Sequence, residues 1–72
     1  MGNPYLSIVI PVYNEEENIC TLYNSLTPIC QKIGKTYEII FVDDGSTDRS
    51  IPILCSLQEQ DKVIELIKKN AK

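Results

Sequence analysis

Residues 37–46 read Tyr-Glu-Ile-Ile-Phe-Val-Asp-Asp-Gly-Ser, and this stretch decides the fold of the chain. Five of the six residues from Tyr37 to Val42 are apolar, which predicts a strand. The strand ends abruptly at Asp43 and Asp44, so two carboxylates stand directly at its carboxyl end. Ser-Thr-Asp follows at 46–48, and each of these side chains offers an oxygen that can cap the start of a helix.

A second apolar run and a helical pattern precede this stretch. Residues 6–12 (LSIVIPV) are largely β-branched and uncharged, which is typical of a strand covered on both faces. An amphipathic stripe with spacings of three and four follows and ends at Gly34, a natural helix stop. Asn14 with Glu17 three residues later predicts the cap of this helix. Pro28 within the stripe predicts a kink, or a split with a new helix start.

Two further elements are predicted after the double aspartate. A helix should bury four residues: Ile51, Leu54, Cys55 and Leu57. Residues 63–67 (VIELI) predict a third short strand. The resulting order is strand–helix–strand–helix–strand, an α/β fold with parallel strands in the order 3-2-1, half of a Rossmann-like sheet. The first strand then lies at an exposed edge, so a missing C-terminal half or self-association is expected to cover it.

Composition indicates one partial globular domain over residues 1–72. The chain is 43% hydrophobic and 24% charged, and both values are ordinary. A net charge of −3 argues against nucleic-acid binding, which needs excess positive charge. The longest uncharged stretch, Asn18–Gln31, is too polar and too short for a membrane span, and no signal peptide is expected.

Cysteine and histidine usage narrows the chemistry further. The three cysteines, Cys20, Cys30 and Cys55, form no Cys-x-x-Cys pair, and the chain has no histidine. The sequence therefore predicts neither a zinc site nor Ser–His or Cys–His catalysis. Small buried thiols on helix faces indicate a reducing compartment, so we expect a cytoplasmic protein.

Two polar clusters are expected to face one crevice, because ligands of open parallel sheets bind beyond the carboxyl ends of the strands. One cluster is residues 11–15 and the other is residues 43–46. Carboxylates select hydrogen-bond donors such as ring N–H groups, ribose hydroxyls or a hydrated cation, and Tyr13 offers a flat face for a base. Carboxylates without a nearby cation repel phosphates. The two clusters are therefore expected to bind the nucleoside part of a nucleotide and not its phosphates. Alternatively, residues 15–17 only stabilise a helix N-terminus and residues 43–45 only form a turn.

The two motifs together resemble a known family. Ser7–Ile19 (SIVIPVYNEEENI) and Tyr37–Asp48 (YEIIFVDDGSTD) are similar to the opening of family-2 glycosyltransferases, most strongly the dolichyl- or polyprenyl-phosphate sugar transferases. The resemblance implies a GT-A fold. It also implies inverting transfer of a sugar from a UDP- or GDP-linked nucleotide-sugar to an acceptor such as a polyprenyl phosphate, with Mg²⁺ or Mn²⁺ as cofactor.

The resemblance also implies roles for five residues. Pro11, Tyr13 and Glu15 would line the nucleoside pocket, with Glu15 near the ribose. Asp44 would accept the ring N–H of the base, and Asp43 would support the turn. The Asp-x-Asp metal motif, the catalytic base and the acceptor-binding segments of the family do not occur in residues 1–72. The segment is therefore expected to hold no metal or catalytic residue and to be inactive alone.

Two other classes of protein remain as alternatives. A receiver-type phosphoacceptor domain also has an acidic pair at a strand end, although there the pair follows the first strand. A non-enzymatic interaction module would use the exposed sheet edge to bind a partner or a second copy.

Overall fold

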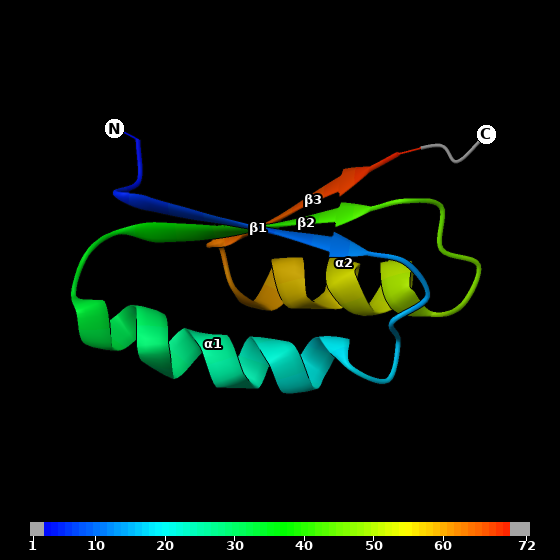
Figure 1. Ribbon diagram of the computed structural model, residues 1–72, viewed down its shortest axis with the longest axis horizontal. Coiled ribbons are helices and arrows are strands. Elements are labelled where there is room, and N and C mark those ends of the chain that lie inside the picture. Colours follow the sequence, from blue (N-terminus) through cyan, green and yellow to red (C-terminus); the bar gives the residue numbers. More distant parts are fainter. Residues whose placement is uncertain (1–2, 70–72) are drawn as a thin grey trace.

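The computed structural model describes residues 3–69 and contains the five expected elements (Figure 1). They are β1 (Leu6–Val12), α1 (Ile19–Ile33), β2 (Tyr37–Asp43), α2 (Ser50–Gln60) and β3 (Ile64–Lys68). The predicted order is confirmed. β3 begins and ends one residue later than the sequence suggests, and β2 includes Asp43.

The three strands are parallel, with β2 in the centre, which confirms the 3-2-1 order. The register between β1 and β2 runs from Leu6 opposite Tyr37 to Val12 opposite Asp43. Asp43 lies opposite Lys68 on its other side. The carboxyl ends of all three strands therefore form one rim of the sheet.

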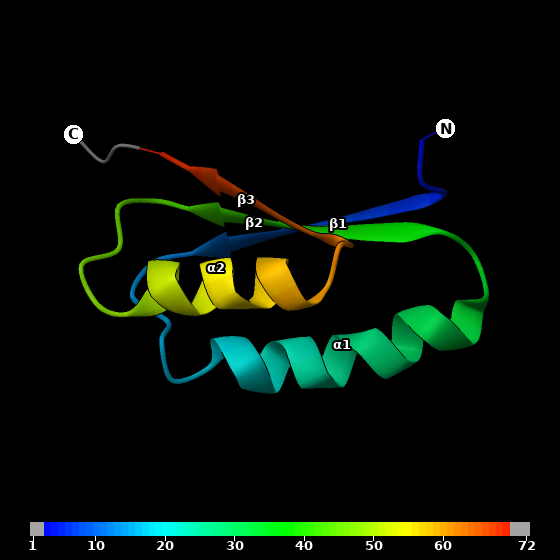
Figure 2. The same ribbon diagram turned by 180° about the vertical axis from the view of Figure 1, so that it is seen from behind.

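Both helices cover the same face of the sheet (Figures 1 and 2). This follows from the topology, because two right-handed crossovers that step in the same direction place their helices on the same side. Phe41 and Ile39 of β2 lie in the centre of the core and are fully buried, as is Leu54 of α2. Ile19 of α1 belongs to the same buried cluster.

The prediction that β1 is covered on both faces is wrong for the residues the structure describes. Burial alternates along the strand, and Val9 is 61% exposed. No helix of residues 3–69 reaches this open face, since both crossovers lie on the other side. On the open face Ser7 Oγ donates a hydrogen bond to the Glu38 carboxylate. A hydrogen bond with the Glu38 side chain and the negative charge of Glu38 raise the pKa of the Glu65 carboxyl.

The start of α1 differs from the predicted cap. The helix begins after Asn18, which makes no side-chain capping hydrogen bond, and Asn14 lies four residues further back in the left-handed region at φ 51°. The capping prediction for Asn14 and Glu17 is therefore wrong, because the Asn14 side chain binds a different loop. Gly34 ends the helix as expected, at φ 76°, and its N–H donates to the carbonyl of Gln31.

Pro28 does not split α1, which runs unbroken from Ile19 to Ile33. Thr27 does not cap a new helix, because its hydroxyl donates to the Tyr23 carbonyl one turn earlier, at 3.1 Å. Such a bond is common for threonine inside helices.

α2 buries Leu54 and Leu57 as predicted, whereas Ile51 and Cys55 are half-buried. The three cysteines are free thiols; Cys30 is buried and Cys20 is exposed, contrary to the expectation for Cys20. Neither helix of the described chain is long and apolar enough to cross a bilayer.

Candidate functional site

The loops that follow β1 and β2 begin side by side. Val12 and Asp43 are register partners, and the Asp44 N–H donates to the Val12 carbonyl at 2.9 Å. The predicted neighbourhood of the two strand ends is thus present. Residues 13–18 and residues 44–49 form the two loops of this rim.

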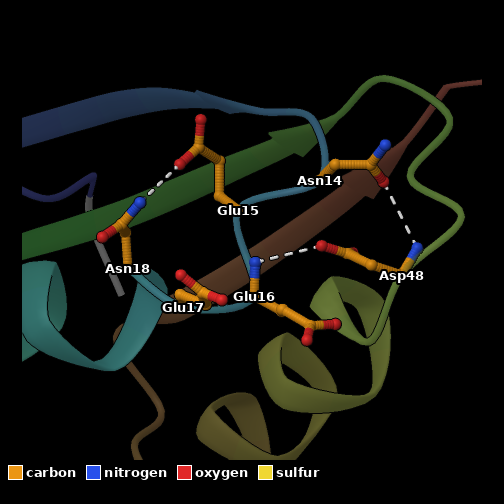
Figure 3. A pocket seen from close by; sticks show the side chains of 6 residues that line it. All are labelled: Asn14, Glu15, Glu16, Glu17, Asn18 and Asp48. Atoms are coloured by element: carbon orange, nitrogen blue, oxygen red, sulfur yellow. Dashed lines mark hydrogen bonds between the residues drawn. The ribbon is translucent and has the colours of Figure 1, made fainter.

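Asn14 joins the two loops. Its backbone N–H donates to Ser46 Oγ at 2.9 Å, and its side-chain Oδ1 accepts a hydrogen bond from the Thr47 N–H at 2.8 Å. The same Oδ1 also accepts the Asp48 N–H at 3.2 Å (Figure 3). Asparagine tolerates the left-handed conformation better than most residues, which allows the chain to turn at this point. One amide side chain therefore satisfies two backbone donors of the loop after β2.

Three more hydrogen bonds, in both directions, connect the loop after β1 with the loop after β2 and with the first residue of α2. The Glu15 N–H donates to Ser50 Oγ at 2.9 Å, and the Glu16 N–H donates to Asp48 Oδ2 at 3.2 Å. In return the Arg49 N–H donates to Glu16 Oε1 at 2.8 Å. Each loop supplies side-chain oxygens for backbone N–H groups of the other, so the two loops hold each other in place.

Asp48 precedes Arg49, the N-cap residue of α2, and its Oδ1 accepts the N–H of Ser50, the first residue of that helix, at 2.8 Å. Partial desolvation acts to raise the pKa of Asp48. Hydrogen bonds from the Ser50 side chain and from the N–H groups of Ser50 and Glu16 oppose it and leave the pKa below its ordinary value. These bonds favour the ionised carboxylate.

The two adjacent aspartates have opposite environments. Asp43 is fully buried and accepts hydrogen bonds from the N–H groups of Gly45 (3.2 Å) and Ser46 (2.9 Å) and from Ser46 Oγ (2.5 Å). Gly45 has a φ of 86°, a conformation that glycine adopts without strain. Asp44 is exposed, and no hydrogen bond from residues 3–69 reaches its carboxylate. Only Asp44 therefore has its acceptor oxygens available to a ligand.

Two pockets open at this rim. The larger has a volume of about 380 Å³ and is lined by Asn14, Glu15, Glu16, Glu17, Asn18 and Asp48 (Figure 3). The smaller, about 80 Å³ and mostly apolar, is lined by Ile10, Pro11, Val12, Glu15, Asn18, Ile19, Leu22 and Phe41. Glu15 lines both pockets, and its Oε1 accepts a hydrogen bond from Asn18 Nδ2 at 3.0 Å. Tyr13 is 56% exposed beside them, at the carboxyl end of β1.

Backbone donors of this rim are already engaged. Six consecutive N–H groups, from Gly45 to Ser50, each donate to a side-chain oxygen of Asn14, Glu16, Asp43 or Asp48. A phosphate cradle needs free N–H groups at such a helix start. Among the described residues, no group of three or more carboxylates and thiols is arranged to hold a metal ion. The rim therefore presents exposed acceptors and an aromatic ring, which suit a ligand rich in N–H and O–H donors.

The sequence did not reveal the residues that join the loops. Asn14, Ser46 and Ser50 were assigned to helix caps, or to no role, from local spacing alone. Their hydrogen bonds connect positions 32 to 35 residues apart. No local pattern encodes such a pairing; only the parallel register of β1 and β2 could have suggested it.

Comparison with known proteins supports the resemblance seen in the two motifs. Residues 7–72 match glycosyl transferase family 2. The undecaprenyl-phosphate 4-deoxy-4-formamido-L-arabinose transferase of Pectobacterium atrosepticum is 57% identical over 49 residues, which are 68% of this chain and 15% of that protein. Transferases of the same name from Edwardsiella ictaluri and Enterobacter sp. are 50% and 47% identical over 69% and 76% of this chain. The chain spans 15% and 17% of those two relatives.

The match covers both strand ends and both loops of the rim, since it begins at Ser7 and includes every described residue after it. The chain belongs to glycosyl transferase family 2.

Proposed function

We propose that this chain is the nucleoside-binding segment of an inverting glycosyltransferase that moves a sugar from a UDP- or GDP-linked donor to an acceptor such as a polyprenyl phosphate. Membership of glycosyl transferase family 2 supports the reaction class. The relatives named as undecaprenyl-phosphate transferases support the acceptor class. The nucleotide-sugar donor is implied by the family, and the exposed acceptors of the rim suit the nucleoside part of such a donor.

The observation that carries this proposal is the difference in burial and hydrogen bonding between the two adjacent aspartates. Asp43 is buried and saturated by its own turn, whereas Asp44 is exposed beside it. In our proposal Asp44 accepts the ring N–H of the base, and Asp43 fixes the turn that presents it. A charge-assisted hydrogen bond of this kind is stronger than a neutral one.

Three residues at the end of β1 complete the proposed nucleoside site. Tyr13 is exposed and can stack on the base. Glu15 lines both pockets, and its carboxylate can accept ribose hydroxyls. Pro11 lines the smaller, apolar pocket. Pro11 pairs with Val42 and Val12 pairs with Asp43, so the chain that leads to Tyr13 and Glu15 leaves the sheet next to the double aspartate.

Residues 3–69 offer no fit for the diphosphate or its metal, because the rim donors are engaged and the carboxylates are not grouped for a cation. The ligands of Mg²⁺ or Mn²⁺, the catalytic base and the acceptor site would have to lie on residues outside this segment. We therefore propose that the 72-residue chain alone transfers no sugar. Its nucleotide affinity should be about millimolar or weaker, near −4 kcal/mol.

Calorimetric titration with UDP- and GDP-linked sugars, with and without Mg²⁺ or Mn²⁺, tests these statements. We expect weak binding that the metal does not change and that Asp44→Asn abolishes. The matched control is Glu59→Gln, at an exposed site on α2, which should leave binding unchanged. Tight, metal-dependent binding, sugar transfer by the purified chain, or an Asp44→Asn variant that binds normally would contradict the proposal.

A cytoplasmic location is part of the same proposal. All three cysteines are free thiols, and such thiols persist in reducing compartments. Labelling of Cys20, the exposed thiol, in intact and permeabilised cells would test it.

A further inference from the structure

We propose that Ser46 is a positioning residue of the nucleoside site, because its hydroxyl group joins the loop that carries Tyr13 and Glu15 to the turn that carries Asp44. This role rests on the proposed function, in which those three side chains contact the nucleoside. Ser46 itself would not touch the ligand; it would act by fixing the two parts of the site relative to each other.

The Ser46 hydroxyl group has a partner on each side. It accepts the backbone N–H of Asn14 at 2.9 Å, and it donates to Asp43 Oδ1 at 2.5 Å. Because the Asn14 N–H can only donate, the hydroxyl proton of Ser46 is left for the carboxylate. A hydrogen bond to a carboxylate is stronger than one between neutral groups. One hydroxyl group therefore connects the loop after β1 to the buried carboxyl end of β2.

The same residue closes the turn that presents Asp44. The Ser46 N–H donates to Asp43 Oδ2 at 2.9 Å, so Ser46 binds both oxygens of the Asp43 carboxylate. Asp44 lies between these two residues, and its own N–H donates to the Val12 carbonyl at 2.9 Å. The backbone on both sides of Asp44 is therefore anchored, while its side chain stays exposed.

The loop after β1 is held at two consecutive peptide groups. The Asn14 N–H belongs to the peptide group that links Tyr13 to Asn14, and the Glu15 N–H belongs to the next one. Ser46 Oγ accepts the first N–H and Ser50 Oγ accepts the second, each at 2.9 Å. These bonds hold Asn14 at a φ of 51°, a conformation that persists in such residues where the surroundings fix it. The directions of Tyr13 and Glu15, which flank Asn14, therefore depend on the two serines.

The neighbouring Thr47 offers a matched control. Its side chain is exposed, and its N–H donates to Asn14 Oδ1 at 2.8 Å. Thr47→Ala removes a hydroxyl group from the same loop and keeps this N–H, whereas Ser46→Ala removes both bonds of the Ser46 hydroxyl. Ser46→Thr keeps the hydroxyl group at a half-buried position and is the conservative variant. Circular dichroism confirms that all three variants fold.

NMR relaxation of the ligand-free 72-residue chain tests whether Ser46 holds the loop. We expect amide order parameters of about 0.85 at Asn14 and Glu15 in the wild type, falling toward about 0.6 in Ser46→Ala. The order parameter of the core residue Phe41 should stay unchanged, and Ser46→Thr and Thr47→Ala should resemble the wild type. Unchanged order at Asn14 in Ser46→Ala, or an equal fall at Phe41, would overturn the role in holding this loop.

Titration of the same variants with a UDP- or GDP-linked sugar tests whether this order matters for binding. We expect Ser46→Ala to weaken nucleotide binding at least about fivefold, because a loosened loop must be ordered again when the ligand binds. Ser46→Thr should regain most of the affinity, and Thr47→Ala should bind as the wild type does. Recovery with threonine would show that the hydroxyl group itself is needed.

The two measurements separate failure of this role from failure of the nucleoside site. A Ser46→Ala chain that has a loosened loop and binds nucleotide as tightly as the wild type would overturn the positioning role and leave the nucleoside site intact. A wild-type chain that binds no nucleotide would contradict the proposed function, and with it any role of Ser46 in binding, even where the order parameters show that Ser46 holds the loop.

Discussion

The rim at the carboxyl ends of β1 and β2 has two layers that use similar residue types differently. The inner rim, comprising Asn14, Asp43, Ser46, Asp48 and Ser50, directs its side-chain oxygens to backbone N–H groups and to one another. The outer rim, comprising Tyr13, Glu15 and Asp44, is exposed. Carboxylates occur in both layers, so acidity alone does not distinguish them. Those of the inner rim accept backbone N–H groups, whereas in the outer rim Glu15 accepts a hydrogen bond from the side chain of Asn18 and no hydrogen bond from the described residues reaches the Asp44 carboxylate.

The largest expected effect comes from the centre of the inner rim. Asp43→Ala should lower the free energy of unfolding by about 3 kcal/mol, because the part-buried N–H groups of Gly45 and Ser46 lose their acceptor. The matched control is Asp44→Ala, which should stay within about 0.5 kcal/mol. Urea unfolding of both variants measures the difference, and equal losses would remove the distinction between the layers.

Asn14 should rank second. Asn14→Ala loses two hydrogen bonds and strains a backbone at φ 51°, so we expect a loss of about 2 kcal/mol. Asn14→Gly keeps the backbone relaxed and should lose about 1 kcal/mol. Asn18→Ala, which removes one exposed hydrogen bond, is the control and should lose less than about 0.5 kcal/mol. If glycine and alanine at position 14 behave alike, backbone strain plays no part.

Acid should weaken the inner rim through Asp48. Its pKa is lowered in the folded chain, so its contribution to stability is present above the ordinary aspartate pKa and is lost as the pH falls through the depressed value. Asp48→Asn should flatten the pH dependence of the free energy of unfolding across this acidic range. An unaltered acid profile in Asp48→Asn would contradict the assignment.

The smallest effect on stability is expected in the outer rim. Tyr13→Ala removes an exposed ring and should change the free energy of unfolding by less than about 0.5 kcal/mol. The same variant should nevertheless lose measurable nucleotide binding, since the ring would no longer stack on the base. Tyr13→Phe is the control, because it keeps the ring and should keep both properties. A large loss of stability in Tyr13→Ala would place the tyrosine in the inner rim.

Much of this fold was predictable from the sequence because the signals are local. The apolar run 37–42 and the abrupt change at Asp43 mark a strand and its end, and Gly34 marks a helix stop through its backbone conformation. Helical crossovers make the strands parallel, which gives the shared rim, and consecutive strands usually lie side by side, which gives the strand order. The sequence therefore predicts that the loops after β1 and β2 lie close together.

The parts that were not predictable depend on tertiary contacts. The side-chain oxygen of Asn14 could accept N–H groups of the helix that follows it or of a loop more than thirty residues away. Only the register of the folded strands determines that it binds the loop. The exposed face of β1 was missed for a similar reason. An apolar strand such as residues 6–12 looks the same in the sequence whether the helices cover one face of the sheet or both.

NMR of the isotopically labelled chain tests the difference between the inner and the outer rim most directly. It shows which backbone amides respond when a nucleotide binds. During titration with a UDP- or GDP-linked sugar, we expect the amide signals of Tyr13, Glu15 and Asp44 to shift together and with one affinity. The core amides of Phe41 and Leu54 should stay in place. Shifts confined to surfaces away from the rim would contradict a nucleoside site formed by these residues.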